Sequence, residues 1–150
     1  MFTRKLNSKR GSAVVELALS GTLLMFIAFG ASDFAGLFFD GIAVTNSAGS
    51  AAFYGADDNI RSGDFATIVQ KAKDDSEDDV GTVTPTATQM CICNTGAKFD
   101  CQLYQETNCG TYGVPRAYVR VVVEEPFDSI SGIGLFPNVT VKRVAYMRVR

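Results

Sequence analysis

The amino-acid sequence predicts an α+β fold, in which a long N-terminal hydrophobic helix precedes a small head with a short helix and an antiparallel β-sheet. Two patterns support this prediction. Residues 12–54 contain no proline and mostly suit one helix, whereas apolar and polar residues alternate in several segments after residue 82. The length of 150 residues indicates one folding unit with an appendage.

The first predicted element is a helix over residues 12–55, whose N-terminal part is apolar enough to cross a membrane. Residues 17–32 carry no charge, and within residues 12–32 only Glu16 is charged. As a helix, this stretch is roughly 31 Å long, about the thickness of the hydrocarbon core of a bilayer. Residues 1–16 hold four bases and one acid, a net charge of +3, which predicts an N-terminus in the cytoplasm and a C-terminus outside.

Two other interpretations of the apolar segment stay open. A removable signal peptide also has a basic start and an apolar run, and Ala28-Phe29-Gly30 has the small residues of a cleavage site. Glu16 at the start of the run argues against it, as does the apolar pattern that continues after Gly30. A buried helix of a soluble protein is the third interpretation, although a run of 21 residues is long for such a helix.

The remaining elements are one short helix and several strands. Residues 62–79 are predicted to form the helix, which Ser62 or Asp64 can cap and whose end is acidic. Strands are expected over residues 82–93, 98–103, 117–123 and 138–150, with a turn at 94–96 and with Pro85 favouring an edge position. The last strand places Val139, Val141, Arg143, Ala145, Met147 and Val149 on one face, and Thr140, Lys142, Val144, Tyr146 and Arg148 on the other.

The four cysteines, Cys91, Cys93, Cys101 and Cys109, are interpreted as two disulfides, because the head is expected in an oxidising compartment. A zinc site of four thiolates is the alternative, but its usual C-x2-C pairs are missing. Cys91 and Cys93 would share one strand face and are not expected to pair with each other. Of the three connectivities, a nested one fits a hairpin around Gly96 and would join Cys93 to Cys101 and Cys91 to Cys109.

Composition excludes several classes of function. The chain has no histidine, which excludes histidine-based acid–base chemistry, Ser-His and Cys-His nucleophile pairs, and histidine-containing zinc sites. A net charge of -2 gives no reason to expect nucleic-acid binding. No convincing pair of carboxylates or phosphate-binding loop is present. We therefore expect no catalytic residues, no metal site, no cofactor and no enzymatic activity.

The N-terminal sequence Lys9-Arg10-Gly11-Ser12-Ala13-Val14-Val15-Glu16-Leu17 has a basic pair, a glycine and an apolar helix with a glutamate at its fifth position. This motif resembles the class III signal of type IV prepilins. Together with the long helix, the cysteine-bearing middle and the closing strands, it is similar to the TadE-like pseudopilins of the Tad (Flp, type IVb) pilus system. The resemblance covers most of the chain, from about residue 9 to residue 150.

The resemblance implies a prepilin leader over residues 1–11, a long helix over 12–55 with its transmembrane half at 12–32, and an extracytoplasmic α+β head over 56–150. Prepilin peptidase would cut between Gly11 and Ser12 on the cytoplasmic side. Glu16 would then face the new α-amine of a neighbouring subunit and set the register of assembly, since an unpaired carboxylate in hydrocarbon costs roughly 2.5–3.5 kcal/mol.

The implied function is that of a pseudopilin or minor pilin in adhesion or secretion. Its implied partners are prepilin peptidase, the pilus assembly platform and other pilin or pseudopilin subunits. It would reside in the bacterial inner membrane before assembly and in a pilus or at the cell surface afterwards. The chain departs from the family where Leu17 replaces an aromatic residue and Ser20-Gly21 replaces Leu-Pro. The alternative is a membrane-tethered or secreted binding module, stapled by disulfides, that does not polymerise.

Overall fold

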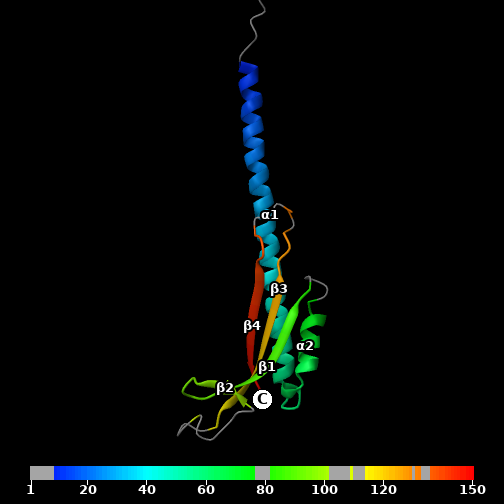
Figure 1. Cartoon of the computed structure of the whole chain (residues 1–150), viewed down its shortest axis with the longest axis vertical. Coiled ribbons are helices and arrows are strands. Elements are labelled where there is room, and N and C mark those ends of the chain that lie inside the picture. Colours follow the sequence, from blue (N-terminus) through cyan, green and yellow to red (C-terminus); the bar gives the residue numbers. More distant parts are fainter. Residues whose placement is uncertain (1–8, 77–81, 102–108, 110–113, 130, 133–135) are drawn as a thin grey trace, which may run out of the picture. The chain divides into compact units, whose positions relative to one another are not determined.

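The computed structural model describes residues 9–76, 82–101, 109, 114–129, 131–132 and 136–150. These residues form helix α1 (Lys9–Ala56), a 3-10 turn η1 (Arg61–Gly63), helix α2 (Phe65–Asp74) and strands β1 (Thr84–Ile92), β2 (Lys98–Asp100), β3 (Arg116–Pro126) and β4 (Thr140–Arg148) (Figure 1). The strands make one antiparallel sheet in the order β2-β1-β3-β4. A long apolar helix, one short helix and an antiparallel sheet confirm the predicted α+β fold.

The chain divides into two compact units. The first contains residues 1–36 and 129–137, and the second contains residues 37–128 and 138–150. Helix α1 contributes to both units, so its residues from Leu37 onward belong to the unit that contains the sheet. The predicted boundaries at residues 11 and 55 stay predictions, and residues 1–8 of the predicted leader lie outside the described residues.

Strand β3 is the centre of the second unit. It pairs with β1 on one side and with β4 on the other, and its alternating residues Val119, Val121 and Val123 are fully buried. β-branched side chains suit a strand that is covered in this way. The strand extends from Arg116 to Pro126, beyond the predicted segment 117–123, because its ends continue to pair with β1 and β4.

Helices α1 and α2 pack together in this unit. The Ser47 hydroxyl donates a hydrogen bond of 2.6 Å to the carbonyl of Ala72, and Ile68 of α2 is fully buried. A Cβ atom placed on Gly55 would lie 2.5 Å from Cδ1 of Ile68 and 3.2 Å from Cγ1 of Val119. The absence of a side chain at Gly55 therefore lets α1, α2 and β3 approach one another closely.

The alternation predicted for the last strand is confirmed. Val141 and Ala145 lie on the more buried face of β4, and Val144 and Tyr146, on the opposite face, are 40% and 44% exposed. Pro85 pairs with Val123 of β3, and the described pairing of β1 with β2 begins only at Met90. Among the described residues Pro85 is thus paired on one side only, a position in which its missing N–H is tolerated.

Helix α2 is shorter than predicted. Its N-cap is Asp64, whose carboxylate accepts a hydrogen bond of 3.2 Å from the backbone N–H of Thr67. This contact lowers the pKa of Asp64, chiefly through the hydroxyl of Thr67. The helix ends at Asp74, within the acidic run that opposes the helix dipole. Residues 77–79 of the predicted helix lie outside the described residues.

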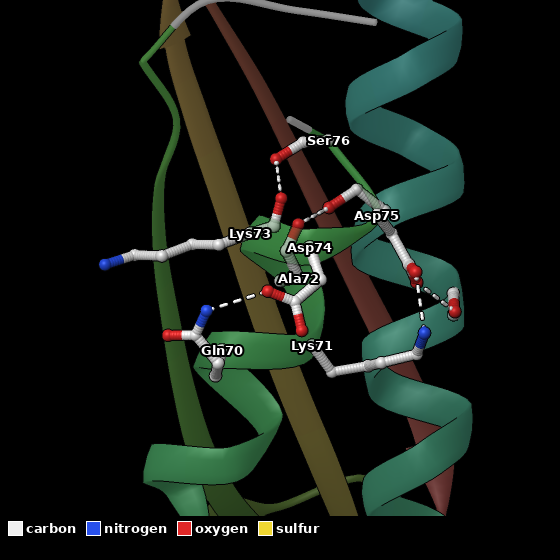
Figure 2. A network of polar contacts seen from close by, with 9 residues as sticks. Gln70, Lys71, Ala72, Lys73, Asp74, Asp75 and Ser76 are labelled. Atoms are coloured by element: carbon white, nitrogen blue, oxygen red, sulfur yellow. Dashed lines mark hydrogen bonds and ion pairs between the residues drawn. The ribbon is translucent and has the colours of Figure 1, made fainter. Parts of the chain in front are cut away.

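A polar network joins the end of α2 to α1 (Figure 2). Asp75 accepts a hydrogen bond of 2.7 Å from Lys71 and another of 2.5 Å from the hydroxyl of Ser50 on α1. Burial raises the pKa of Asp75, but the hydrogen bonds from Lys71 and Ser50 and the charge of Lys71 outweigh this effect and lower the pKa. The same hydrogen bond raises the pKa of Lys71. The network therefore favours the charged form of both groups at neutral pH.

Candidate functional site

The candidate site is the exposed N-terminal part of α1, in the first unit. By length and composition the helix is apolar enough to cross a membrane, and its most apolar part is not buried in the protein. Leu17, Leu23 and Phe26 are 74%, 63% and 59% exposed. A helix with so much exposed apolar surface needs lipid or other helices around it.

Gly11, Ser12 and Glu16 are all exposed and lie in the first turns of α1. α1 begins at Lys9, so the predicted leader junction between Gly11 and Ser12 is itself helical. A Cβ atom placed on Gly11 would meet nothing within 4 Å. Ser12 and Glu16 are four residues apart and therefore lie on one face of the helix. These groups are therefore accessible to an external partner.

Asp33 is a second feature of the first unit, and sequence reasoning did not find its role. It directly follows the charge-free run, yet it is fully buried. Its carboxylate accepts hydrogen bonds of 2.8 Å from the hydroxyl of Ser129 and from the backbone N–H of Ser131, as well as one from the hydroxyl of Ser131. Gly132 follows with a φ of 66°, in the left-handed region that favours glycine. These hydrogen bonds hold the loop after β3 against α1, directly after the charge-free run.

Replacing Asp33 by alanine is expected to make this loop more mobile. The N–H of Ser131 would lose its acceptor on Asp33, and a donor left without its partner costs about 1–3 kcal/mol. Amide hydrogen exchange at Ser131 should accelerate by about tenfold or more, measured on the full chain in lipid nanodiscs. Ser32→Ala is the matched control, since the Ser32 hydroxyl donates a hydrogen bond of 3.0 Å to the carbonyl of Ala28 in its own helix. If amide hydrogen exchange at Ser131 is unchanged in Asp33→Ala, then Asp33 does not hold the loop in place.

The cysteines form two disulfides, Cys91–Cys101 and Cys93–Cys109. The predicted nested pairing is therefore wrong, although Cys91 and Cys93 indeed do not pair with each other. The β1–β2 register explains the difference, because Cys91 lies opposite Phe99 and the backbone N–H of Cys93 bonds to Ala97. Cys101 is therefore diagonal to Cys91, whereas Cys93 sits at the turn and pairs with the more distant Cys109. All four sulfurs are used in disulfides, so the zinc alternative loses its ligands.

Within the residues that the structure describes, no cluster of three or more histidine, cysteine, aspartate or glutamate side chains could hold a metal ion. Comparison with protein families, with curated proteins and with solved structures finds no match to this chain. The features that bear on function are therefore the N-terminal motif and the exposure of the helix that contains it.

Proposed function

We propose that this chain is a TadE-like pseudopilin or minor pilin. On this proposal prepilin peptidase removes residues 1–11, and the mature subunit resides in the bacterial inner membrane with its sheet outside the cytoplasm. The assembly platform then adds it, through α1, to other pilin or pseudopilin subunits of a type IVb (Tad) pilus or pseudopilus that serves adhesion or secretion. The main support is that Gly11 and Glu16 lie, exposed, at the start of one continuous apolar helix.

The chemistry of assembly follows from the position of Glu16. Its carboxylate lies one turn inside an otherwise charge-free stretch, where an unpaired charge costs roughly 2.5–3.5 kcal/mol at the bilayer centre. Cleavage after Gly11 creates a positive α-amine at Ser12. Pairing of that amine with Glu16 of a neighbouring subunit would offset the desolvation of both charges. An incoming subunit would thus be held at one axial position, and no catalytic group is needed.

The first test is the mature N-terminus. Mass spectrometry of protein purified from a strain with prepilin peptidase should find Ser12 as the first residue, and Gly11→Leu should leave the chain uncut. Gly21→Leu is the matched control, because a Cβ atom on Gly21 also meets nothing within 4 Å. A mature chain that begins at Met1, or one cut after Gly30, would overturn the processing step.

The second test separates a filament subunit from a tether. Glu16→Ala should reduce the subunit recovered in sheared filaments by tenfold or more, because the α-amine of the neighbouring subunit would be left without a carboxylate partner in an apolar environment. The amount in the membrane should stay unchanged. Thr22→Ala is the control, since the Thr22 hydroxyl bonds within its own helix at 2.6 Å to Ala18.

Normal recovery of Glu16→Ala would instead favour a membrane-tethered or secreted binding module. The two disulfides of the second unit suit such a module as well as a pilin head.

A further inference from the structure

The two faces of the sheet in the second unit have different surroundings. The odd-numbered residues of β3 and β4 face α1, since Val119 is fully buried and Nε of Arg143 donates a hydrogen bond of 3.2 Å to the hydroxyl of Thr45 on α1. Neighbouring residues of a strand point to opposite faces, so the even-numbered residues form the other face, which we call the outer face. Val144 and Tyr146 on the outer face are 40% and 44% exposed. This face is therefore accessible to an external partner.

The outer face is positively charged, although the chain has a net charge of -2. Strand pairing places even-numbered residues opposite even-numbered residues throughout, so the outer face extends across all four strands. It contains five basic and two acidic residues, an excess of three positive charges. The bases are Lys98, Arg116, Arg120, Lys142 and Arg148, and the acids are Asp100 and Glu124. A surface with this excess attracts anionic partners.

Four of the bases lie with two tyrosines at one end of the outer face. Nζ of Lys98 lies 5.5 Å from the centroid of the Tyr146 ring, and Nε of Arg120 donates a hydrogen bond of 3.3 Å to the Tyr146 hydroxyl. Arg148 lies directly opposite Tyr118 in the pairing of β3 with β4. Tyr146 thus brings together cations from β2 and β3. We call these four bases the basic patch: Lys98, Arg116, Arg120 and Arg148.

We propose that the basic patch binds an acidic polysaccharide. Carboxylates of the polysaccharide would contact the guanidinium groups, which match carboxylates in shape and hydrogen-bond them in pairs. Sugar hydroxyls would bond to the hydroxyls of Tyr118 and of Thr88, which lies opposite Arg120 and is exposed. The inference goes beyond the proposed function and shares with it only the position of the sheet outside the cytoplasm.

The width of the basic patch favours an extended ligand. It reaches from Lys98 on β2 to Arg148 on β4, and these two residues and Arg116 are exposed. Arg116 and Arg120 are four residues apart on β3, roughly 13 Å at the rise of a β-strand. A single small anion cannot contact all four bases at these separations, whereas a polymer can.

The spacing of the charges favours a polysaccharide over a nucleic acid. Each strand of DNA carries a phosphate about every 3.4 Å, which is much denser than the bases of the patch. The position between Arg116 and Arg120 on the outer face is Tyr118, which offers a hydroxyl and no charge. In addition, Lys98 lies over the ring of Tyr146, which limits the stacking that binds single strands. Sparse cations with hydroxyls between them fit carboxylates that are separated by sugar units.

Binding of the purified full chain in detergent to immobilised polygalacturonate, followed by biolayer interferometry, tests the proposal. We expect binding that weakens as salt is added, because exposed charges are screened. Arg116→Gln combined with Arg148→Gln should raise the dissociation constant at least about tenfold, since two cations of the patch are lost. Arg61→Gln combined with Lys73→Gln is the matched control. It removes the same charge from exposed positions beside the helices and should change binding less than about twofold.

The uncut, unassembled chain is sufficient for this measurement, so the result is independent of cleavage after Gly11 and of filament formation. Circular dichroism must show the same unfolding midpoint for both double variants as for wild type. Absence of polygalacturonate binding by the folded chain, equal binding to neutral dextran, or equal losses in the two double variants would overturn the proposal. Tighter binding to double-stranded DNA, or to vesicles of phosphatidylglycerol, would assign the patch to a nucleic acid or to a membrane and also overturn it.

Discussion

Replacing Cys93 and Cys109 together by serine is expected to lower the free energy of unfolding of the second unit by about 2–4 kcal/mol. The bridge spans 16 residues and joins two cysteines that are buried, so its removal increases the freedom of the unfolded chain and leaves hydroxyls in a buried place. Denaturant unfolding followed by circular dichroism should show a lower midpoint. An unchanged denaturant midpoint would show that the Cys93–Cys109 disulfide does not stabilise the second unit.

A single substitution verifies which cysteines are paired. In Cys93→Ser the free thiol should be on Cys109, whereas a nested connectivity would free Cys101. Alkylation under denaturing conditions followed by trypsin places both candidates on one peptide, residues 99–116. Fragment ions of that peptide then identify the alkylated cysteine. The test needs no cleavage between Cys91 and Cys93, which only Ile92 separates.

Gly55→Ala is expected to lower the free energy of unfolding by about 1–3 kcal/mol, the usual effect of overpacking a core. The new methyl group would lie 2.5 Å from Cδ1 and 3.0 Å from Cγ1 of Ile68, and 3.2 Å from Cγ1 of Val119. Ile68 and Val119 are fully buried, so neither side chain can move into solvent. Thermal unfolding of the full chain in detergent measures the difference from wild type.

Gly49→Ala is the matched control on the same helix. Its new methyl group meets nothing within 4 Å, and alanine favours a helix over glycine by about 1 kcal/mol. In dilute detergent this variant should be as stable as wild type or up to about 1 kcal/mol more stable. Equal destabilisation by Gly55→Ala and Gly49→Ala would show that helix geometry, and not the contact with Ile68, determines the effect.

Local patterns were sufficient to predict most of the fold. The charge-free run predicted the long helix, Asp64 was one of two predicted caps for α2, and the alternation over residues 138–150 predicted the two faces of β4. Each of these features depends on residues that are close together in the sequence. Element ends were less accurate, because β3 is extended by pairing with its neighbours and not by its own composition.

Contacts between distant residues could not be predicted. The cysteine pairing depends on a turn in which the N–H of Gly96 bonds to the carbonyl of Cys93 and Gly96 has a φ of 86°. This turn places Cys93 opposite Ala97, four residues before Cys101, the partner that the nested pairing would need. The contact between Asp33 and Ser131 joins segments nearly a hundred residues apart, and no local spacing indicates it.

The candidate site, in contrast to these distant contacts, can be found from the sequence. Gly11, Ser12 and Glu16 are recognised by their order along the chain, and the structure adds that they are exposed on one helix. The motif is therefore recognised from the sequence alone, and the structure contributes only its exposure.

The central position of β3 makes the second unit sensitive to how much of the chain is present. Its neighbour β4 is formed by Thr140–Arg148, and the backbone N–H of Arg150 bonds to the carbonyl of Ala56 at 3.2 Å. A chain truncated before β4 would leave the valine-rich β3 with a free edge, and such edges pair with strands of other chains. Incomplete synthesis, or proteolysis near residue 138, would thus yield a product prone to aggregation in place of a smaller folded domain.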